Sequence, residues 1–207
     1  MEGTARRAQI VAATVRLVGQ YGLEGTTVSR IARAVGVSEM ALYRYFENKT
    51  DMLAAALEYV VGRSADWHRS SSHAWVPTRL REIGHNHLEM VTSDVEMWNS
   101  PMMQFAMNRP AREWIAPVFE PSHDMDETVA RLTEPRRLLF SYVEEGKRQG
   151  SIRPDVDPTA FQWLWMSWAQ GEDMHYLNAA VTGDFNREPH LRLLELIIGE
   201  IELPEPR

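Results

Sequence analysis

Apolar residues recur at intervals of three and four along most of the chain, and no stretch alternates with the period of a β-strand. This pattern predicts an all-α fold without internal repeats. The first predicted helix follows Thr4, which can cap it, and Gly22 ends it. Its apolar stripe consists of Ile10, Ala13, Thr14, Leu17, Val18 and Tyr21.

Residues 26–53 predict two short helices, a tight turn between them and the start of a third helix. Gly36 ends the first short helix, whose apolar positions are Val28, Ile31, Ala32 and Val35. Ser38 can cap the second, in which Leu42 and Phe46 are expected to face the first. Two helices that cross at a tight turn form a helix-turn-helix, and its second helix fits a B-DNA major groove of about 12 Å width.

The remainder of the chain predicts a second, larger helical domain. Asn48 and Asp51 resemble a capping box that begins a helix running toward Trp67. Prolines at 101, 110, 117 and 121 permit only short helices in that stretch. Further helices are expected over 78–95, over 124–149 with an interruption or kink at Pro135, over 158–180 after the cap Asp157, and over 189–201. We therefore divide the chain into a helix-turn-helix domain, 1–48, and a second domain, 49–207.

Charge is unevenly distributed along the 207 residues, whose formal net charge is −7. Residues 1–49 contain seven Lys and Arg against four Asp and Glu, a balance of +3, whereas the remainder carries 15 against 25, a balance of −10. A mildly basic first domain is compatible with nucleic acid despite the acidic total. The chain has no Cys, no signal-peptide pattern and no apolar run of membrane-spanning length, so we expect a cytoplasmic protein without a membrane partner.

The outer side of the second short helix offers groups that can read DNA bases. Arg44 can hold guanine O6 and N7 together, Met40 can contact a thymine methyl, and Glu39 can accept a hydrogen bond from cytosine N4. Thr27 and Lys49, each near the start of a helix, are expected to hold phosphates. The competing interpretation, solvated side chains on a generic helical hairpin, fits each residue taken singly.

Taken as one block, TTVSRIARAVGVSEMALYRYFENKTDML closely resembles the DNA-binding signature of the tetracycline-repressor (TetR) family of bacterial regulators. The resemblance covers about residues 5–57. It implies an all-helical C-terminal domain that forms a homodimer and encloses an effector pocket. The phosphate contacts that it implies are Thr27, Ser38, Tyr43, Tyr45 and Lys49, and the base-facing positions are Glu39, Met40 and Arg44.

Two apolar stripes are candidates for a dimer interface in the form of a four-helix bundle between subunits. They consist of Phe161, Leu164, Trp165 and Trp168 on one predicted helix and of Leu191, Leu194 and Ile198 on another. The alternative is that both stripes pack inside one chain. We favour the dimer because a two-fold symmetric operator requires two DNA-reading helices, one from each subunit.

Met and aromatic side chains crowd the proline-rich middle of the chain and are candidates for an adaptable apolar effector pocket. The candidates are Trp98, Met102, Met103, Phe105 and Trp114, together with Met166 in a later helix. Ordinary core packing is the alternative for each of them. Glu172 and Asp173 are expected to be solvated, so the sequence does not favour a cationic effector.

No enzyme motif is present: the chain lacks HExxH, GxSxG, a Walker loop and a Gly-rich dinucleotide turn. His85 and His87 point about 200° apart on a helix, so neither a metal nor a cofactor is expected. The sequence thus predicts a ligand-responsive DNA-binding regulator, most simply a repressor that a small, largely apolar effector releases from a palindromic operator. The alternative is an architectural or partner-recruiting DNA-binding module without effector control.

Overall fold

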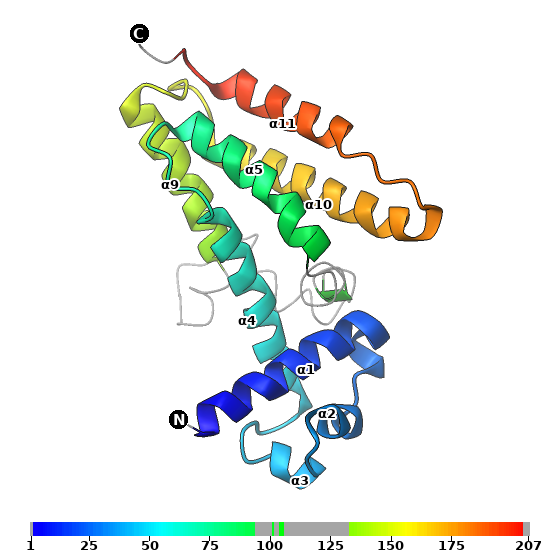
Figure 1. Ribbon diagram of the computed structural model, residues 1–207. Helices are drawn as coiled ribbons and strands as arrows, with labels where there is room; N and C mark the ends of the chain where they lie inside the picture. The colour runs from blue at the N-terminus through cyan, green and yellow to red at the C-terminus, as the bar shows by residue number, and fades with distance from the viewer. Residues whose placement is uncertain (1, 94–100, 102–103, 106–132, 205–207) are drawn as a thin grey trace. The chain divides into compact units, whose positions relative to one another are not determined.

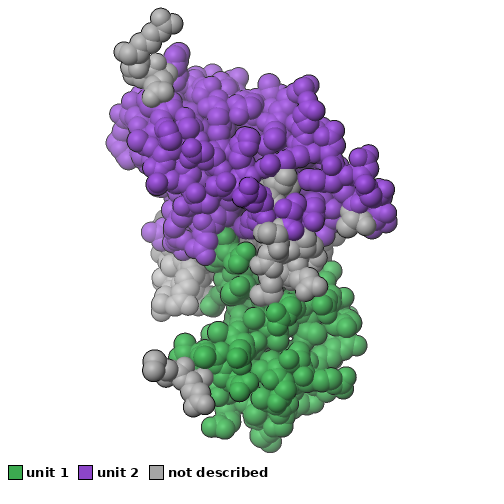
Figure 2. Space-filling model, in the orientation of Figure 1, with its two compact units in different colours: residues 1–63, 94–133 green, residues 64–93, 134–207 purple. Residues whose placement is uncertain are grey.

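The computed structural model describes residues 2–93, 101, 104–105 and 133–204, which form helices and one isolated antiparallel bridge between Ile152 and Glu202 (Figure 1). The predicted all-α fold is confirmed. Each described helix is too short or too polar to cross a lipid bilayer. The chain divides into two compact units, residues 1–63 with 94–133 and residues 64–93 with 134–207 (Figure 2). The functional boundary at 48/49 stays a prediction.

The first unit begins with α1, Glu2–Gly25, whose axis breaks at Gly22 with φ 69° and ψ 176°. This backbone conformation is open mainly to glycine, so the helix breaks at Gly22, but helical structure resumes beyond the break and α1 ends at Gly25, later than predicted. Thr4 lies inside the first turn of α1 and does not cap it, because the helix begins at Glu2, three residues earlier than expected. Tyr21, placed on the apolar stripe, is 52% exposed and lies under the Arg30 guanidinium at 4.2 Å from the ring centroid.

Three further helices follow: α2, Val28–Val35, α3, Glu39–Leu42, and α4, Lys49–His68. α1 packs on α2, and α2 on α3. Buried apolar side chains from all four helices form the interior of the first unit: Ile10, Val15, Val18, Ile31, Ala32, Leu42, Phe46, Met52, Leu53, Leu57 and Val60. The described residues of this unit therefore bury the faces that the sequence periodicity predicted for α2 and α3.

The second unit contains α5, Val76–Ser93, α9, Glu134–Gln149, α10, Pro158–Thr182, and α11, Glu188–Ile201. Residues 124–132 of the predicted 124–149 helix lie outside the described residues. Pro135 occupies the first turn of α9, where its missing N–H is not needed, so no kink occurs there. Asp157 caps α10 as predicted, accepting a hydrogen bond from the Thr159 N–H at 2.8 Å.

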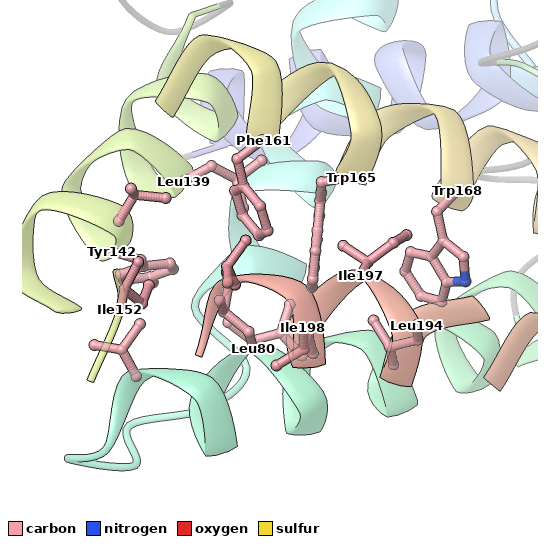
Figure 3. Packing of buried hydrophobic residues seen from close by; sticks show 14 of the residues in the cluster. Leu80, Leu139, Tyr142, Ile152, Phe161, Trp165, Trp168, Leu194, Ile197 and Ile198 are labelled. Carbon is pink, nitrogen blue, oxygen red and sulfur yellow. The ribbon is translucent and has the colours of Figure 1, made fainter. Parts of the chain in front are cut away.

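The core of the second unit lies between α5, α9, α10 and α11, which contact one another in five pairs among the described helices. Phe161, Trp165 and Trp168 project from α10 toward α5 and α11 (Figure 3). Gly84 of α5 allows a close approach, since a Cβ there would lie 2.4 Å from Leu194 Cδ2. Polar contacts close the rim of this core, notably the Arg79–Glu145 pair with N–O distances of 2.7 and 2.8 Å.

Candidate nucleic-acid interface and buried polar cluster

Local hydrogen bonds fix the starts of α2 and α3 and the turn between them, and the cap at Ser38 is the one predicted from the sequence. Thr27 Oγ1 accepts from the Arg30 N–H at 3.2 Å, and Ser38 Oγ accepts from the Ala41 N–H at 3.3 Å. Gly36 adopts the left-handed conformation with φ 74° and ψ 36°. The Val37 N–H then returns to the Ala32 carbonyl at 3.0 Å, which completes a glycine-based helix stop.

α3 presents one face to the core and the other to solvent. Leu42 and Phe46 are 0% and 5% exposed, as predicted. The exposed side carries the side chains predicted to contact DNA: Ser38, Glu39, Met40, Tyr43 and Arg44. The regular helix ends at Leu42, and Tyr43 and Arg44 lie in the turn that follows, whereas the sequence suggested a longer helix.

Two of the three remaining predicted phosphate contacts are more enclosed. Thr27 is exposed at the start of α2, while Tyr45 and Lys49 are half-buried. Lys49 Nζ donates to the Leu23 carbonyl at 3.0 Å and so ties the start of α4 to the end of α1. Arg7 is part of α1, and its Cζ lies 4.8 Å from the centroid of the Phe46 ring. This cation–π contact helps to hold the segment that follows α3 against α1.

Asn48 and Asp51 fix the beginning of α4. Asn48 Oδ1 accepts from the Asp51 N–H at 3.0 Å, which is the first half of the predicted capping box. The Asp51 carboxylate reaches one residue further back than in a standard box, accepting from the Glu47 N–H at 3.1 Å. The start of α4 is thereby joined to the end of the helix-turn-helix.

The predicted effector-pocket residues are not brought together within the described part of the chain. Trp98, Met102, Met103 and Trp114 lie outside the described residues. Phe105 is fully buried in the first unit, and Met166 is partly buried against the core of the second.

The predicted dimer stripes occupy the core of the second unit instead. Five of the seven predicted positions are at most 3% exposed: Phe161, Trp165, Trp168, Leu194 and Ile198. Their surfaces are already covered by their own chain, which is the intramolecular packing that the sequence left as the alternative. Leu164 differs, since it is 46% exposed. The outward faces of α10 and α11 carry the apolar residues that the sequence reasoning missed: Trp163, Met174, Val181, Leu193 and Leu196.

A cluster of ionisable side chains lies buried in the second unit, and the sequence did not reveal it. Glu172 and Asp173, expected in solvent, are 0% and 4% exposed. Glu172 Oε2 lies 2.8 Å from His87 Nδ1, and Asp173 Oδ1 lies 3.4 Å from His87 Nε2. Arg187 Nε lies 3.9 Å from the other oxygen of Glu172. Burial raises the pKa of Asp173 to about 6, against the opposing attraction of His87.

His68 lies in the same interior, with its ring centroid 4.2 Å from that of Trp67, which in turn lies 4.3 Å from that of His87. Its Nδ1 is 2.7 Å from the Ser64 carbonyl oxygen. Burial lowers the pKa of His68 to about 4, so the ring is neutral at pH 7. The carboxylates and imidazoles of this cluster come from α4, α5 and α10, which explains why no local sequence pattern announces it.

Comparison with known proteins identifies the first unit. The sequence model described as bacterial regulatory proteins, tetR family, matches residues 10–56. The nucleoid occlusion factor SlmA of Haemophilus influenzae is 43% identical over 56 residues, which are 27% of this chain and 26% of that protein. The HTH-type transcriptional regulator BetI of Serratia proteamaculans is 36% identical over 56 residues, 27% of this chain and 28% of that protein. The chain thus matches about a quarter of the length of these relatives.

Solved structures extend the likeness in fold to nearly the whole chain. A TetR transcriptional regulator from Chloroflexus aurantiacus is 20% identical with a TM-score of 0.74, over 98% of this chain and 99% of that one. FadR from Bacillus subtilis, solved with stearoyl-CoA, is 18% identical with a TM-score of 0.70, over 92% and 97%. At these identities the likeness establishes the fold. Residues 10–56 thus carry the sequence pattern of the tetR family of bacterial regulatory proteins, and nearly the whole chain shares the fold of the TetR regulator from Chloroflexus aurantiacus.

Proposed function

We propose that this protein is a dimeric repressor of the tetR family that binds a palindromic operator and is released by a small, largely apolar effector. The observation that carries the proposal is the arrangement of α3. Its buried side fixes the helix on α2, while Glu39, Met40 and Arg44 lie exposed beside one another. An exposed helix held in this way enters the major groove and contacts base edges.

The roles of the side chains follow from their chemistry. Arg44 is the strongest candidate for reading a guanine, because a guanidinium donates two parallel hydrogen bonds. The phosphate-holding set is the one predicted from the sequence: Thr27, Ser38, Tyr43, Tyr45 and Lys49. Phosphate contacts set register and salt dependence without choosing a sequence.

The outward face of α10 and α11 supports a homodimer. Trp163, Met174 and Val181 follow one another along α10 at intervals of eleven and seven residues, which places them on one side of the helix, and they are 51%, 40% and 89% exposed. Leu193 and Leu196 of α11 are 44% and 66% exposed. A Cβ at Gly171 or Gly199 would meet nothing within 4 Å, so both helices have open positions where a second backbone can approach. Such a set of exposed apolar side chains marks an interaction surface.

The proposed dimer is tested with Leu196→Glu, because that side chain is 66% exposed and its loss should not disturb the monomer core. We expect sedimentation to show a dimer for the wild type and a monomer for the variant, with unchanged helical content. The control is Arg192→Glu, which changes charge on the same helix at an exposed polar position. An equally dimeric Leu196→Glu variant would contradict this interface.

Effector control follows if the effector binds two states of the protein with different affinity. α4 is the element available to transmit this difference, because its first turns are buried in the first unit and its last turn belongs to the second. If the distance between the DNA-reading segments of the two subunits changes, they no longer match half-sites at a fixed separation, and binding to the operator weakens. The FadR structure with stearoyl-CoA supports an apolar effector, since a protein of the same fold holds a ligand with a long apolar chain.

Footprinting on the DNA flanking the gene tests the regulatory function. We expect one protected, roughly palindromic site at physiological salt. The absence of a protected site would contradict the proposal. Arg44→Ala should relax the preference at one base position and its symmetry mate. Lys49→Gln, which keeps a donor for the Leu23 carbonyl, should weaken all sequences alike and lower the salt slope by about one per subunit.

A second function remains, because the nucleoid occlusion factor SlmA is 43% identical to this chain over 56 residues. In this alternative the protein acts as a DNA-bound architectural or partner-recruiting factor without effector control. The two functions differ in their binding sites: a repressor protects one operator near its target gene, whereas an architectural factor occupies many dispersed sites. Genome-wide binding of the tagged full-length chain separates them.

A further inference from the structure

Resting on the proposed effector control, we propose that His68 and Trp165 hold the polar end of the effector, and that the effector is an uncharged apolar molecule bearing a hydroxyl group. The two side chains come from α4 and α10 in the second unit. They present one hydrogen-bond acceptor and one donor inside an aromatic interior. Such a pair fits a group that both donates and accepts.

His68 is a fixed acceptor. Its Nδ1 lies 2.7 Å from the Ser64 carbonyl oxygen, which can only accept, so Nδ1 carries the proton and donates. In a neutral imidazole the other nitrogen is then a lone-pair acceptor. Burial lowers the pKa of His68 to about 4, which keeps the ring neutral at physiological pH. Nε2 is buried and makes no hydrogen bond with the described residues.

Trp165 is the matching donor. Three indoles lie in this core, and two of them have a partner for their N–H: Trp67 donates to the Ile83 carbonyl at 2.6 Å and Trp168 to the His190 carbonyl at 2.8 Å. Trp165 is 0% exposed, and its Nε1 makes no hydrogen bond with the described residues. A buried donor without a partner is costly and rare in native proteins, so it calls for an explanation.

His68 Nε2 and Trp165 Nε1 belong to neighbouring rings. The ring centroids of His68 and Trp165 lie 6.3 Å apart. Two hydrogen bonds of about 2.8 Å each let a single oxygen join nitrogens separated by up to about 5.6 Å. A hydroxyl group has one proton to donate to His68 Nε2 and lone pairs to accept from the Trp165 N–H, so one small polar group matches both atoms.

The charges nearby favour a neutral ligand. Glu172 has His87 at 2.8 Å and Arg187 at 3.9 Å, and Asp173 has His87 at 3.4 Å. An ammonium group can donate to His68 Nε2 but has no lone pair to accept from the Trp165 N–H, so it satisfies only one of the two atoms. An anionic ligand would instead be buried close to two carboxyl groups.

The aromatic rings around His68 and Trp165 indicate the shape and polarity of the rest of the proposed effector. The Trp165 ring lies 6.0 Å from Trp67, 6.0 Å from Phe161 and 5.4 Å from Trp168, measured between centroids. Aromatic walls with few polar groups bind flat apolar bodies and use the polar groups for orientation. A phenol-like or polycyclic alcohol combines these features.

Calorimetric titration of the full chain with three matched probes tests this inference: 2-naphthol, 2-methoxynaphthalene, which accepts but cannot donate, and the cationic 2-(aminomethyl)naphthalene. We expect 2-naphthol to bind at least about tenfold more tightly than either of the others. His68→Phe and Trp165→Phe should each remove the preference for 2-naphthol over the methoxy probe.

Two control variants change similar side chains. Trp168→Phe alters the same core but removes an indole whose N–H is already bonded to the His190 carbonyl, and His73→Phe alters an exposed imidazole. Both should keep the preference. If His68→Phe does not fold, the wild-type ratio and Trp165→Phe decide the matter. Equal affinity for 2-naphthol and the methoxy probe, tighter binding of the amine, or the same loss of preference in Trp168→Phe would overturn the inference.

Operator binding, followed by fluorescence anisotropy, separates this inference from the proposed function. Selective binding of 2-naphthol without release of DNA supports the site and contradicts effector control. Release of DNA by 2-naphthol in wild type and in both His68→Phe and Trp165→Phe supports effector control and overturns the site.

Discussion

Replacing Gly84 by Ala perturbs the packing of α5 against α11 with a single methyl group. The new Cβ would lie 2.4 Å from Leu194 Cδ2 and 2.9 Å from Cδ1. Leu194 is 0% exposed and belongs to the core of the second unit, so it has little room to move. Overpacking of this kind costs about 1–3 kcal/mol, and a contact this short places the cost in the upper half of that range.

Helix propensity acts in the opposite direction, since Ala in a helix interior is favoured over Gly by about 1 kcal/mol. We therefore expect Gly84→Ala to lower the free energy of unfolding by about 1–2 kcal/mol. Gly62→Ala is the matched control, because a Cβ at Gly62 in α4 would meet nothing within 4 Å. It should raise the free energy of unfolding by about 0.5–1 kcal/mol.

Urea unfolding followed by circular dichroism, at one fixed protein concentration, measures both variants. A double-mutant cycle with Leu194→Ala tests the contact directly. Alone, Leu194→Ala should lower the free energy of unfolding by about 2–5 kcal/mol, and adding Gly84→Ala to it should lower it no further. If Gly84→Ala proves as stable as Gly62→Ala, the close approach of α5 to α11 is refuted. If Gly84→Ala costs the same with and without Leu194, the clash lies elsewhere.

Three further outcomes follow from the structure. Asp157→Ala removes the cap of α10 and should cost about 0.5–2 kcal/mol by urea unfolding, whereas Asp157→Ser should retain most of it. Glu202→Gln weakens the pair with Arg81, whose N–O distances are 2.8 and 2.9 Å, and should cost at most about 1 kcal/mol, with the effect shrinking at high salt. The raised pKa of Asp173, about 6, makes stability fall as pH rises from 4 to 6, while the lowered pKa of His68, about 4, makes stability rise from pH 4 to 6.5. Asp173→Asn leaves only the second effect, so its stability should rise more steeply with pH than that of wild type, and parallel curves would contradict the assignment.

Local signals in the sequence predicted the elements that depend on neighbouring residues. The caps at Ser38 and Asp157 and the stop at Gly36 each involve a hydrogen bond or a backbone angle within a few residues. The burial of Leu42 and Phe46 followed from spacing along one short segment. Such features can be read from one sequence because the interacting groups are close along it.

Features that depend on distant segments were not predictable in the same way. Periodicity showed that Trp165 and Trp168 share a stripe, but it cannot say whether a partner subunit or the same chain covers that stripe. The buried cluster joins His87 to Glu172 across 85 positions, and nothing near either residue marks it. The exposed apolar side of α10 and the stripe predicted from the sequence lie on different sides of the same helix. Only the packed structure fixes which side of α10 faces the core.

The boundary between the two compact units falls between residues 63 and 64, inside the continuous helix α4. Inserting one residue there would turn everything beyond it by about 100° about the helix axis and advance it by about 1.5 Å. Exchange of regulatory units between relatives therefore requires a junction that preserves helical phase. Recombination at this point should succeed with insertions of about seven residues, two full turns, and fail with insertions of two or five.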